Sequence, residues 1–269
     1  MIQFIKAHAC GNDFLVVETT QVSAEKQREA AVKLCARNTG VGADGVEYLE
    51  WTGERSGKIR LFNADGSIAE ISGNGTRCVA AWMAHKKRIV TDDILTLATD
   101  AGVRECKIVL AEDHRFQIAS RMGIPTVAPR TVKLSDGTAV EGTVVSTGNP
   151  HFVIFADDAD FTVQGKSWQQ IGQEICFHHD FPEQTNVEFV RVIGTNEIEI
   201  RIFERGVGPT TSSGTGTCAT ATATIALRNG AANLLVRAPG GEQRVEWHGG
   251  EDEILLTGPA ELIACGEAF

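Results

Sequence analysis

The sequence predicts an α+β protein built from two domains of similar plan. The first observation is a repeated phrase, because Ser72 heads Ser-Gly-Asn-Gly-Thr-Arg-Cys and Ser213 heads Ser-Gly-Thr-Gly-Thr-Cys. A phenylalanine precedes each serine by the same ten residues, Phe62 in one half and Phe203 in the other. The second observation is that strand patterns outnumber helical ones, with one glycine-headed, alanine-rich helix in each half. At 269 residues the chain is long enough for two hydrophobic cores.

Local patterns predict the elements of the first half. Residues 2–7 alternate between apolar and polar, residues 14–18 are apolar and β-branched, and the Cys-Gly-Asn-Asp turn between them predicts a β-hairpin. Ser23 is a good N-cap for a helix over residues 24–37. The alanine-rich stretch 77–87 predicts a helix directly after the first glycine phrase. Further strands are expected at 46–49, 58–62, 94–98, 105–110 and 116–122.

The second half repeats this order. Residues 125–129 contain two prolines and predict a crossing between the halves. Helices are expected at 168–176 and at 218–228, the latter closed by Asn229-Gly230. Strands are expected at 143–146, 152–155, 187–192, 197–203, 234–238, 243–247, 253–256 and 261–265. We therefore expect an N-terminal domain at 1–122, joined by the final strand at about 258–269, and a C-terminal domain at 123–257.

Composition narrows the class of protein. A net charge of −10 disfavours nucleic-acid binding, which needs a basic face. The first residues lack a charged segment before an apolar one, and no apolar run is long enough for a membrane span. The seven cysteines are odd in number and never form a CxxC pair, which predicts reduced thiols, no zinc site and a cytoplasmic location.

Each glycine phrase is typical of an anion-binding helix start. A helix N-terminus presents backbone N–H groups and the positive end of the helix dipole, so it can hold a carboxylate or a phosphate. No lysine follows the glycines, which disfavours nucleotide binding. Two such helix starts at matched offsets suggest two facing elements that act on one small anion.

A set of motifs in matching order makes the chain similar to the diaminopimelate epimerase family of cofactor-independent amino-acid racemases and epimerases. The motifs are Gly11-Asn12-Asp13-Phe14, Gly40-Val41-Gly42-Ala43-Asp44-Gly45, Phe62-Asn63-Ala64-Asp65-Gly66-Ser67, Gly73-Asn74-Gly75-Thr76-Arg77-Cys78, Gly148-Asn149-Pro150-His151, Thr185-Asn186-Val187, Glu204-Arg205-Gly206-Val207-Gly208 and Gly214-Thr215-Gly216.

The resemblance implies a fold and a reaction. The fold is two pseudo-symmetric α+β domains, each a curved and mainly antiparallel sheet around a central helix, with the active site in the interdomain cleft. The reaction interconverts LL- and meso-diaminopimelate, a precursor of lysine and peptidoglycan, without pyridoxal phosphate, a metal or another cofactor. Two cysteines act on opposite faces of the α-carbon, one as thiolate base and one as thiol acid. The partner implied is this small amino acid, and a homodimer is a possible assembly.

The chain departs from the family at both of these positions, which are Ser72 and Ser213. A serine hydroxyl ionises far less readily than a thiol and needs a neighbouring base. Three explanations stay open: an engineered double substitution, a natural variant in which other groups carry the protons, or a protein that binds an amino acid without turning it over. We expect the chain to bind substrate and to epimerise it weakly or not at all.

The resemblance also implies roles for other residues. His151 and Glu204 match positions near the reacting centre, although a turn histidine and a salt bridge to a helix end are the competing interpretations. Cys78 and Cys218 lie further along their helices, where structural burial is expected. Gly45 replaces a glutamine that some members carry. The substrate-binding set implied is Asn12, Asn63, Gly73, Asn74, Asn149, Asn186, Glu204, Arg205, Gly214 and Thr215.

Two other functions compete with this one. The first is an isomerase of another amino acid on the same fold, such as a hydroxyproline-type epimerase or a phenazine-biosynthesis-type isomerase. The second is an amino-acid binder without catalysis. The adjacent His178 and His179 lie in a polar stretch, where we expect solvated side chains rather than metal ligands.

Overall fold

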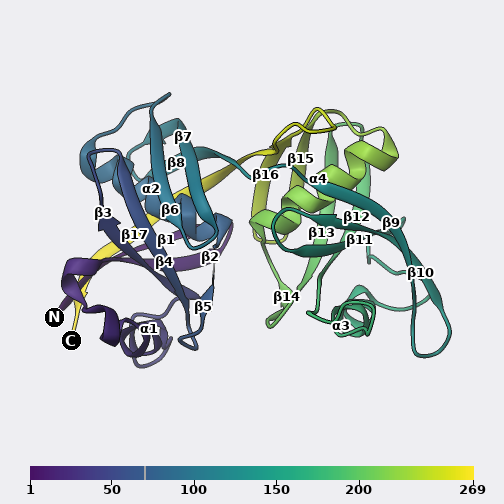
Figure 1. Ribbon diagram of the computed structural model, residues 1–269, viewed down its shortest axis with the longest axis horizontal. Helices are drawn as coiled ribbons and strands as arrows, with labels where there is room; N and C mark the ends of the chain where they lie inside the picture. Colours follow the sequence, from purple (N-terminus) through teal and green to yellow (C-terminus); the bar gives the residue numbers. More distant parts are fainter. Residues whose placement is uncertain (70) are drawn as a thin grey trace. The chain divides into compact units, whose positions relative to one another are not determined.

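The computed structural model describes residues 1–69 and 71–269 and divides into two units. Unit 1 contains Met1–Arg121 and Thr257–Phe269, and unit 2 contains Met122–Leu256. Each unit consists of strands around a central helix (Figure 1). Within the described ranges, no helix is long and apolar enough to cross a membrane.

The strands of unit 1 form a closed ring. In chain order they are β1 (Ile2–Ala9), β2 (Asn12–Glu18), β3 (Gly45–Trp51), β4 (Ser56–Asn63), β5 (Ile68–Ala69), β6 (Ile94–Thr99), β7 (Gly102–Glu112), β8 (Arg115–Arg121) and β17 (Leu255–Ala268). Neighbours pair in the order β1, β2, β3, β4, β6, β7, β8 and β17, and β17 returns to β1. The short β5 adds to β4.

Each face of this ring packs against a different helix. The helix α2 (Gly73–Lys87) shares a buried cluster with Val16, Leu49 and Ile118, among others. The helix α1 (Gln27–Cys35) covers the other face. Successive side chains of a strand point to opposite faces, so Val46 and Tyr48 of β3 pack with α1 while Leu49 packs with α2.

Unit 2 repeats the plan. Its strands are β9 (Thr126–Lys133), β10 (Ala139–Ser146), β11 (Pro150–Phe155), β12 (Asn186–Gly194), β13 (Glu197–Glu204), β14 (Gly208–Thr210), β15 (Asn233–Ala238) and β16 (Gly241–Glu246). The helix α4 (Gly214–Arg228) packs with one buried cluster and α3 (Trp168–Cys176) with another.

The strand pairings confirm the internal duplication. In unit 1, β2–β3 is parallel, β3–β4 antiparallel, β4–β5 antiparallel, β4–β6 parallel and β6–β7 antiparallel. In unit 2, the series β11–β12, β12–β13, β13–β14, β13–β15 and β15–β16 has the same order of directions. The predicted fold class, two domains of similar plan with a mainly antiparallel sheet around a central helix, is therefore confirmed.

The structure corrects several predicted elements. Both glycine phrases form the first turn of their helices rather than loops before them, because each serine is itself the N-cap. The predicted helix over 24–37 starts with a 3-10 turn, Ala24–Lys26, and ends at Cys35. The strand predicted at 261–265 and residues 255–256 of the one predicted at 253–256 belong to the single strand β17. The Asn229 cap is confirmed, with φ of 54°.

The predicted crossing at 125–129 is wrong, since most of it belongs to β9. Pro129 lies opposite Thr143 in this strand, and β10 is the neighbour with which β9 is paired within unit 2. Proline cannot donate to a strand ladder because it has no backbone N–H, but its fixed φ is compatible with extended backbone. The two prolines therefore led to the prediction of a crossing where the chain forms a strand.

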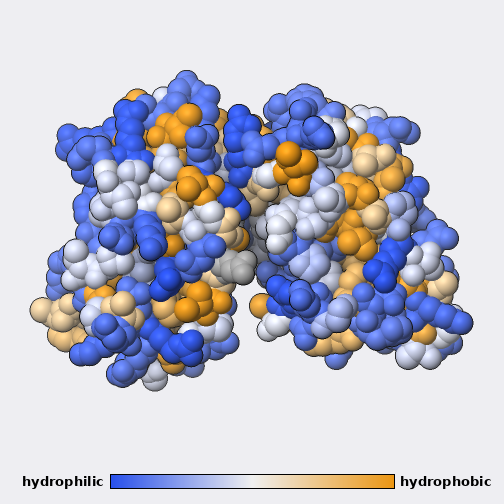
Figure 2. Space-filling model, in the orientation of Figure 1, coloured by the Kyte–Doolittle hydropathy of each residue, from blue (hydrophilic) through white to orange (hydrophobic). Residues whose placement is uncertain are grey.

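The surface is mainly hydrophilic. On the face seen in Figure 2, blue residues cover most of both units, and the orange residues are scattered in small groups. Scattered apolar residues of this kind are normal for a folded protein surface.

The enclosed helix α2 should be sensitive to cavities. We expect Met83→Ala, at a side chain with no exposure in the α2 cluster, to lower the free energy of unfolding by about 2–5 kcal/mol. The exposed Lys87→Ala on the same helix removes a surface ion pair to Glu54 and should cost less than about 1 kcal/mol. Urea unfolding of both variants tests this, and equal losses would contradict the enclosed position of α2.

Candidate active site

Ser72 and Ser213 cap the two central helices in the same way. The Ser72 hydroxyl oxygen accepts a hydrogen bond from the N–H of Gly75 at 3.0 Å, and Ser213 accepts one from Gly216 at 3.2 Å. Both serines have extended backbone angles, as an N-cap requires. Each hydroxyl therefore lies at the positive end of a helix dipole, among backbone N–H groups.

A first polar cluster surrounds the start of α2. Asn12 donates to the Asp44 carboxylate at 2.6 Å and accepts from the side chain of Asn74 at 3.2 Å. The oxygen of Asn74 accepts in turn from Arg77 at 2.6 Å. Arg77 is fully buried and also donates to the carbonyl of Gly73. This network fixes the amides of Asn12 and Asn74 beside the first turn of α2.

Asn63, the remaining predicted residue of unit 1, lies at the end of β4 and donates to the Ser67 hydroxyl at 3.0 Å. The β3–β4 register places it opposite Gly45, and Gly45 lies opposite Phe14 of β2. Asp44 connects these strand ends, because its carbonyl accepts from the N–H of Ala64. Asn12, Asn63 and Asn74 thus come from neighbouring elements of one unit.

A second polar cluster surrounds the start of α4. His151 is fully buried, with Nδ1 at 2.7 Å from Glu188 Oε1 and Nε2 at 3.0 Å from the Asn149 side-chain oxygen. The Asn149 amide donates to the Thr215 hydroxyl at 3.3 Å, and that hydroxyl lies 3.5 Å from the Ser213 hydroxyl. A continuous series of polar contacts therefore runs from a buried carboxyl group to the capping serine.

Asn186 and Arg205 are connected at the edge of this cluster. The buried Asn186 oxygen accepts from the Arg205 backbone N–H at 2.9 Å, and the Arg205 guanidinium donates to the Glu183 carbonyl at 3.0 Å. Glu204 ends β13 and is half-buried. These contacts hold the turn after β13 against the start of β12.

Two buried glutamates that the sequence reasoning missed lie behind the capped helices. Glu47 of β3 is 1% exposed and Glu188 of β12 is 0% exposed. Each lies between two apolar or aromatic residues of its strand and points to the central-helix face, because these flanking residues pack against α1 or α3. The two glutamates are as far apart in the sequence as Ser72 and Ser213. Each is the middle residue of a Val-Glu-aromatic tripeptide, and this repeat is the sequence signal that could have identified them.

The two glutamates have different surroundings. Neither carboxyl oxygen of Glu47 has a hydrogen-bond partner in the part of the chain that the structure describes, and burial raises the pKa of Glu47 to about 8. Glu188 has the imidazole of His151 against one oxygen. Burial therefore favours the protonated form of Glu47 near neutral pH.

The cysteines do not take the place of the missing thiols. Cys78 and Cys218 are 0% exposed within their helices, as expected for packing residues. Burial also raises the pKa of Cys78, which disfavours a thiolate. None of the seven cysteines forms a disulfide within the described chain.

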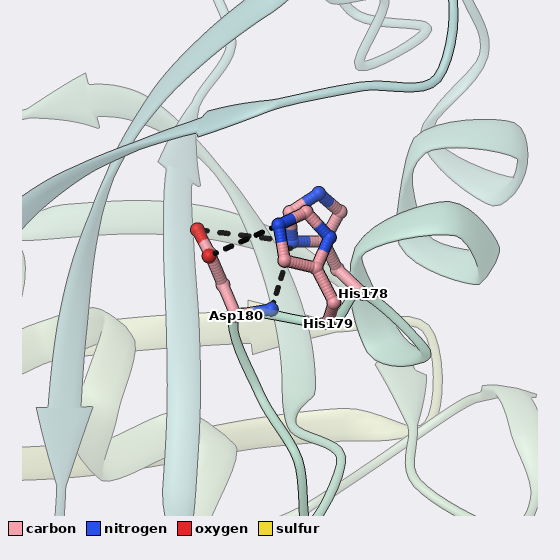
Figure 3. Close-up of side chains that lie close together, drawn as sticks. All are labelled: His178, His179 and Asp180. Carbon is pink, nitrogen blue, oxygen red and sulfur yellow. Dashed lines mark hydrogen bonds and ion pairs between the residues drawn. The ribbon is translucent and has the colours of Figure 1, made fainter.

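His178, His179 and Asp180 form a small group of metal-binding residue types (Figure 3). The sequence predicts solvated histidines rather than metal ligands here, yet their ligand atoms and that of Asp180 lie within 4.8 Å of one another. Both ring nitrogens of His178 already have partners, the Lys133 carbonyl at 3.0 Å and the Asp180 backbone N–H at 3.2 Å. These bonds compete with metal coordination, and we assign no metal to the group.

The glycines under the serines should tolerate no side chain. A methyl group at Gly75 would overlap Glu47 Oε1, so we expect Gly75→Ala to lower the free energy of unfolding by about 1–3 kcal/mol. Shortening the glutamate should relieve the overlap, and the double variant Gly75→Ala, Glu47→Ala should lose less than the sum of the single variants. Additive losses in urea unfolding would show that the two residues do not meet.

Glu47 should make stability depend on pH. Its folded pKa of about 8 lies above the ordinary 4.5, so the folded chain binds more protons between these values. The free energy of unfolding should therefore fall by about 1.4 kcal/mol per pH unit from pH 4.5 to about 8 through this residue. Urea unfolding should show a smaller decline in Glu47→Gln, while the exposed Glu50→Gln follows the parent chain. Parallel declines in all three proteins would count against a neutral Glu47.

A family model and several curated proteins match most of this chain. The family model described as diaminopimelate epimerase matches residues 4–128 and 143–263. The diaminopimelate epimerase of Bacteroides thetaiotaomicron is 33% identical over 266 residues, covering 99% of this chain and 97% of that protein. The Synechocystis protein of the same name is 35% identical and covers 99% of both chains. The chloroplastic protein of Oryza sativa is 34% identical, covering 99% of this chain and 80% of that one.

Solved structures share the fold at lower identity. A predicted epimerase of Pseudomonas aeruginosa has a TM-score of 0.73 at 14% identity, with 99% of both chains covered. A hydroxyproline epimerase of Agrobacterium vitis has a TM-score of 0.70 at 16% identity, with 99% of this chain and 91% of that one covered. These structures share the fold of this chain. The family model and the curated relatives, which cover nearly all of it, show that the chain belongs to the diaminopimelate epimerase family of isomerases.

Proposed function

We propose that the chain interconverts LL- and meso-2,6-diaminopimelate by proton transfer at one α-carbon, with Ser72 and Ser213 at the two acid–base positions. The observation that carries the proposal is the pair of matched helix starts, each capped by a serine whose hydroxyl contacts the helix's own N–H groups. The relatives at 32–35% identity all have the name diaminopimelate epimerase, which favours this substrate over other amino acids.

The reaction needs a group on each face of the α-carbon. One group removes the α-proton and the other delivers a proton to the opposite face, which inverts the centre. We propose that both serine-capped helix ends act on the same substrate molecule. The N–H groups of Gly73-Asn74 and Gly214-Thr215 and the positive helix ends favour the substrate carboxylate and the negative charge that develops when the proton leaves.

The two polar clusters supply the remaining contacts. Asn12, Asn63 and Asn74 in one cluster and Asn149 and Asn186 in the other can donate to a carboxylate and accept from an ammonium group. Arg205 offers a second guanidinium edge to a carboxylate. This set suits a substrate with an amino-acid group at each end. We assign His151 and Glu204 to the control of proton traffic at the second serine.

Serine limits the rate in this scheme. A hydroxyl is a weak acid, so removing an α-proton through it is slower than through a thiolate. No cofactor is needed for the chemistry proposed, and the cytoplasmic location and the possible homodimer remain predictions from the sequence.

Restoring thiols tests the proposal. We expect Ser72→Cys, Ser213→Cys to exchange the α-proton of diaminopimelate in deuterated water at least about 10²-fold faster than the parent chain, because general acid–base catalysis contributes factors of this size. Mass spectrometry of the recovered amino acid measures the exchange, and proline and 4-hydroxyproline are the matched single-headed substrates.

Three outcomes decide between the candidate functions. Exchange that favours hydroxyproline would replace the substrate assignment with that of another isomerase on this fold. Binding without exchange in the double cysteine variant would support a non-catalytic amino-acid binder. Equally fast exchange by the parent chain would contradict the limit set by serine.

A further inference from the structure

The duplicated fold has an asparagine at the same place in each unit, Asn12 and Asn149. Each follows a glycine with a positive φ. Each lies two residues before the start of a parallel strand pairing, which begins at Phe14 in unit 1 and at His151 in unit 2. Each also contacts the second residue after a capping serine. The two asparagines are therefore structural equivalents, and their side-chain amides can be compared directly.

The two amides point in opposite directions. The Asn12 oxygen accepts from Asn74 at 3.2 Å, so this amide presents an acceptor to the start of α2. The Asn149 nitrogen donates to the Thr215 hydroxyl at 3.3 Å, so that amide presents a donor to the start of α4. The same residue type at equivalent positions thus offers opposite hydrogen-bonding groups. The groups behind each amide decide which of the two it offers.

Two groups with a single hydrogen-bonding role fix the direction in unit 1. The Asp44 carboxylate can only accept, and the Asn12 nitrogen donates to it at 2.6 Å. The Arg77 guanidinium can only donate, and it donates to the Asn74 oxygen at 2.6 Å. Turning either amide around would place two acceptors or two donors against each other. Asn12 and Asn74 are therefore ordered head to tail between Asp44 and Arg77.

Asp44 is itself held by several bonds. Its Oδ1 accepts from Arg37 at 2.7 Å, and its Oδ2 accepts from the backbone N–H of Asp13 at 3.1 Å as well as from Asn12. Its backbone N–H donates to the Asp13 carbonyl, and Arg37 also donates to the Asp13 carboxylate. Although 42% of the Asp44 side chain is exposed, both of its oxygens have partners in the chain. The carboxylate therefore has one defined position behind Asn12.

His151 fixes the opposite direction in unit 2. Its Nε2 lies 3.0 Å from the Asn149 oxygen, a contact for which Nε2 has to carry a proton. Because the Asn149 oxygen faces this N–H, the Asn149 nitrogen faces Thr215. A carboxylate behind one asparagine and an N–H behind the other therefore turn two equivalent amides in opposite directions.

We propose that Asp44, held by Arg37, is a positioning residue that fixes the oxygen of Asn12 as an acceptor for the ammonium group of the amino-acid substrate. This inference rests on the proposed function and adds a residue to its site. An amide oxygen has two lone pairs, and Asn74 uses one of those on Asn12. An ammonium group can only donate, so an amide turned the other way would present N–H groups and repel it. Asp44 thereby selects for a donor at this place.

A pair of ligands tests the direction of the amide. Diaminopimelate has ammonium groups, which only donate, whereas the hydroxyl groups of 2,6-dihydroxypimelate donate or accept and tolerate either direction. Asp44→Asn keeps an oxygen for Arg37 and places an amide nitrogen against Asn12, which then turns its own oxygen toward position 44. We expect calorimetry of this variant to show an affinity about tenfold or more lower for diaminopimelate and less than about threefold lower for dihydroxypimelate.

A reciprocal exchange tests for rescue. In Asn12→Asp, Asp44→Asn the side chain at position 12 can only accept, so it again presents an acceptor to the ammonium group, and the net charge is unchanged. We expect the affinity of this double variant for diaminopimelate to return to within about threefold of that of the parent chain. Asp13→Asn is the matched control, because it removes the other carboxylate that Arg37 contacts and keeps the Asn12–Asp44 bond. It should change the affinities for both ligands by the same factor.

The inference requires both the selective loss and the rescue. Equal changes for the two ligands in Asp44→Asn would assign Asp44 a structural role and overturn the inference while the proposed function stands. A double variant that binds diaminopimelate no better than Asp44→Asn would do the same. A parent chain that does not bind diaminopimelate overturns the proposed function, and the inference with it. Thermal unfolding checks that each variant folds.

Neutron diffraction from crystals of the parent chain gives a readout that needs no variant and no ligand. Deuterium positions distinguish the nitrogen of a side-chain amide from its oxygen. We expect the deuterated nitrogen of Asn12 to face Asp44 and that of Asn149 to face Thr215. An Asn12 oxygen that faces Asp44 would overturn the inference whatever the affinities are.

Discussion

The structure depends on how a helix enclosed by strands satisfies its own N-terminus. Water reaches the first turn of such a helix poorly, so its N–H groups need partners within the chain. Ser72 and Ser213 provide them as N-caps, and the glycines that follow let each turn press against a strand. The same packing brings a hydroxyl, a row of backbone dipoles and a buried carboxyl group to one place in each unit.

That requirement explains why the proposed site uses residues that the fold also needs. A helix start whose N–H groups need acceptors is also suited to the anionic group of the proposed substrate. The surrounding amides are fixed by one another: Asn12 joins Asn74, and Asn149 joins Thr215. Side chains held in this way lose little further conformational entropy when a substrate binds, because most of that entropy is already lost on folding.

Much of the fold could be predicted from the sequence because the duplication of the fold appears as repeated sequence motifs. Equal offsets between Phe62 and Ser72 and between Phe203 and Ser213 reflect matching strands and helices. The strand β9 was missed because two prolines suggest a turn, although Pro125 precedes the strand and only Pro129 lies within it. Glu47 and Glu188 were missed because the sequence does not show how deeply a glutamate between apolar residues is buried until the helix that covers it is placed.

The motif residues were recognisable by type, whereas the contacts between Asn149, His151 and Glu188 depend on register between strands distant in sequence.

The difference between the two units bears most directly on the chemistry. In a perfectly symmetric duplication, the two acid–base groups would differ only in which of them holds the mobile proton. His151 breaks this symmetry, because it contacts Glu188 while Glu47 has no such partner within the described chain. In a thiol enzyme the asymmetry can arise from a single mobile proton shared by two similar groups. A serine hydroxyl ionises far less readily than a thiol, so in the proposed function the two serines depend on the different polar groups that surround them.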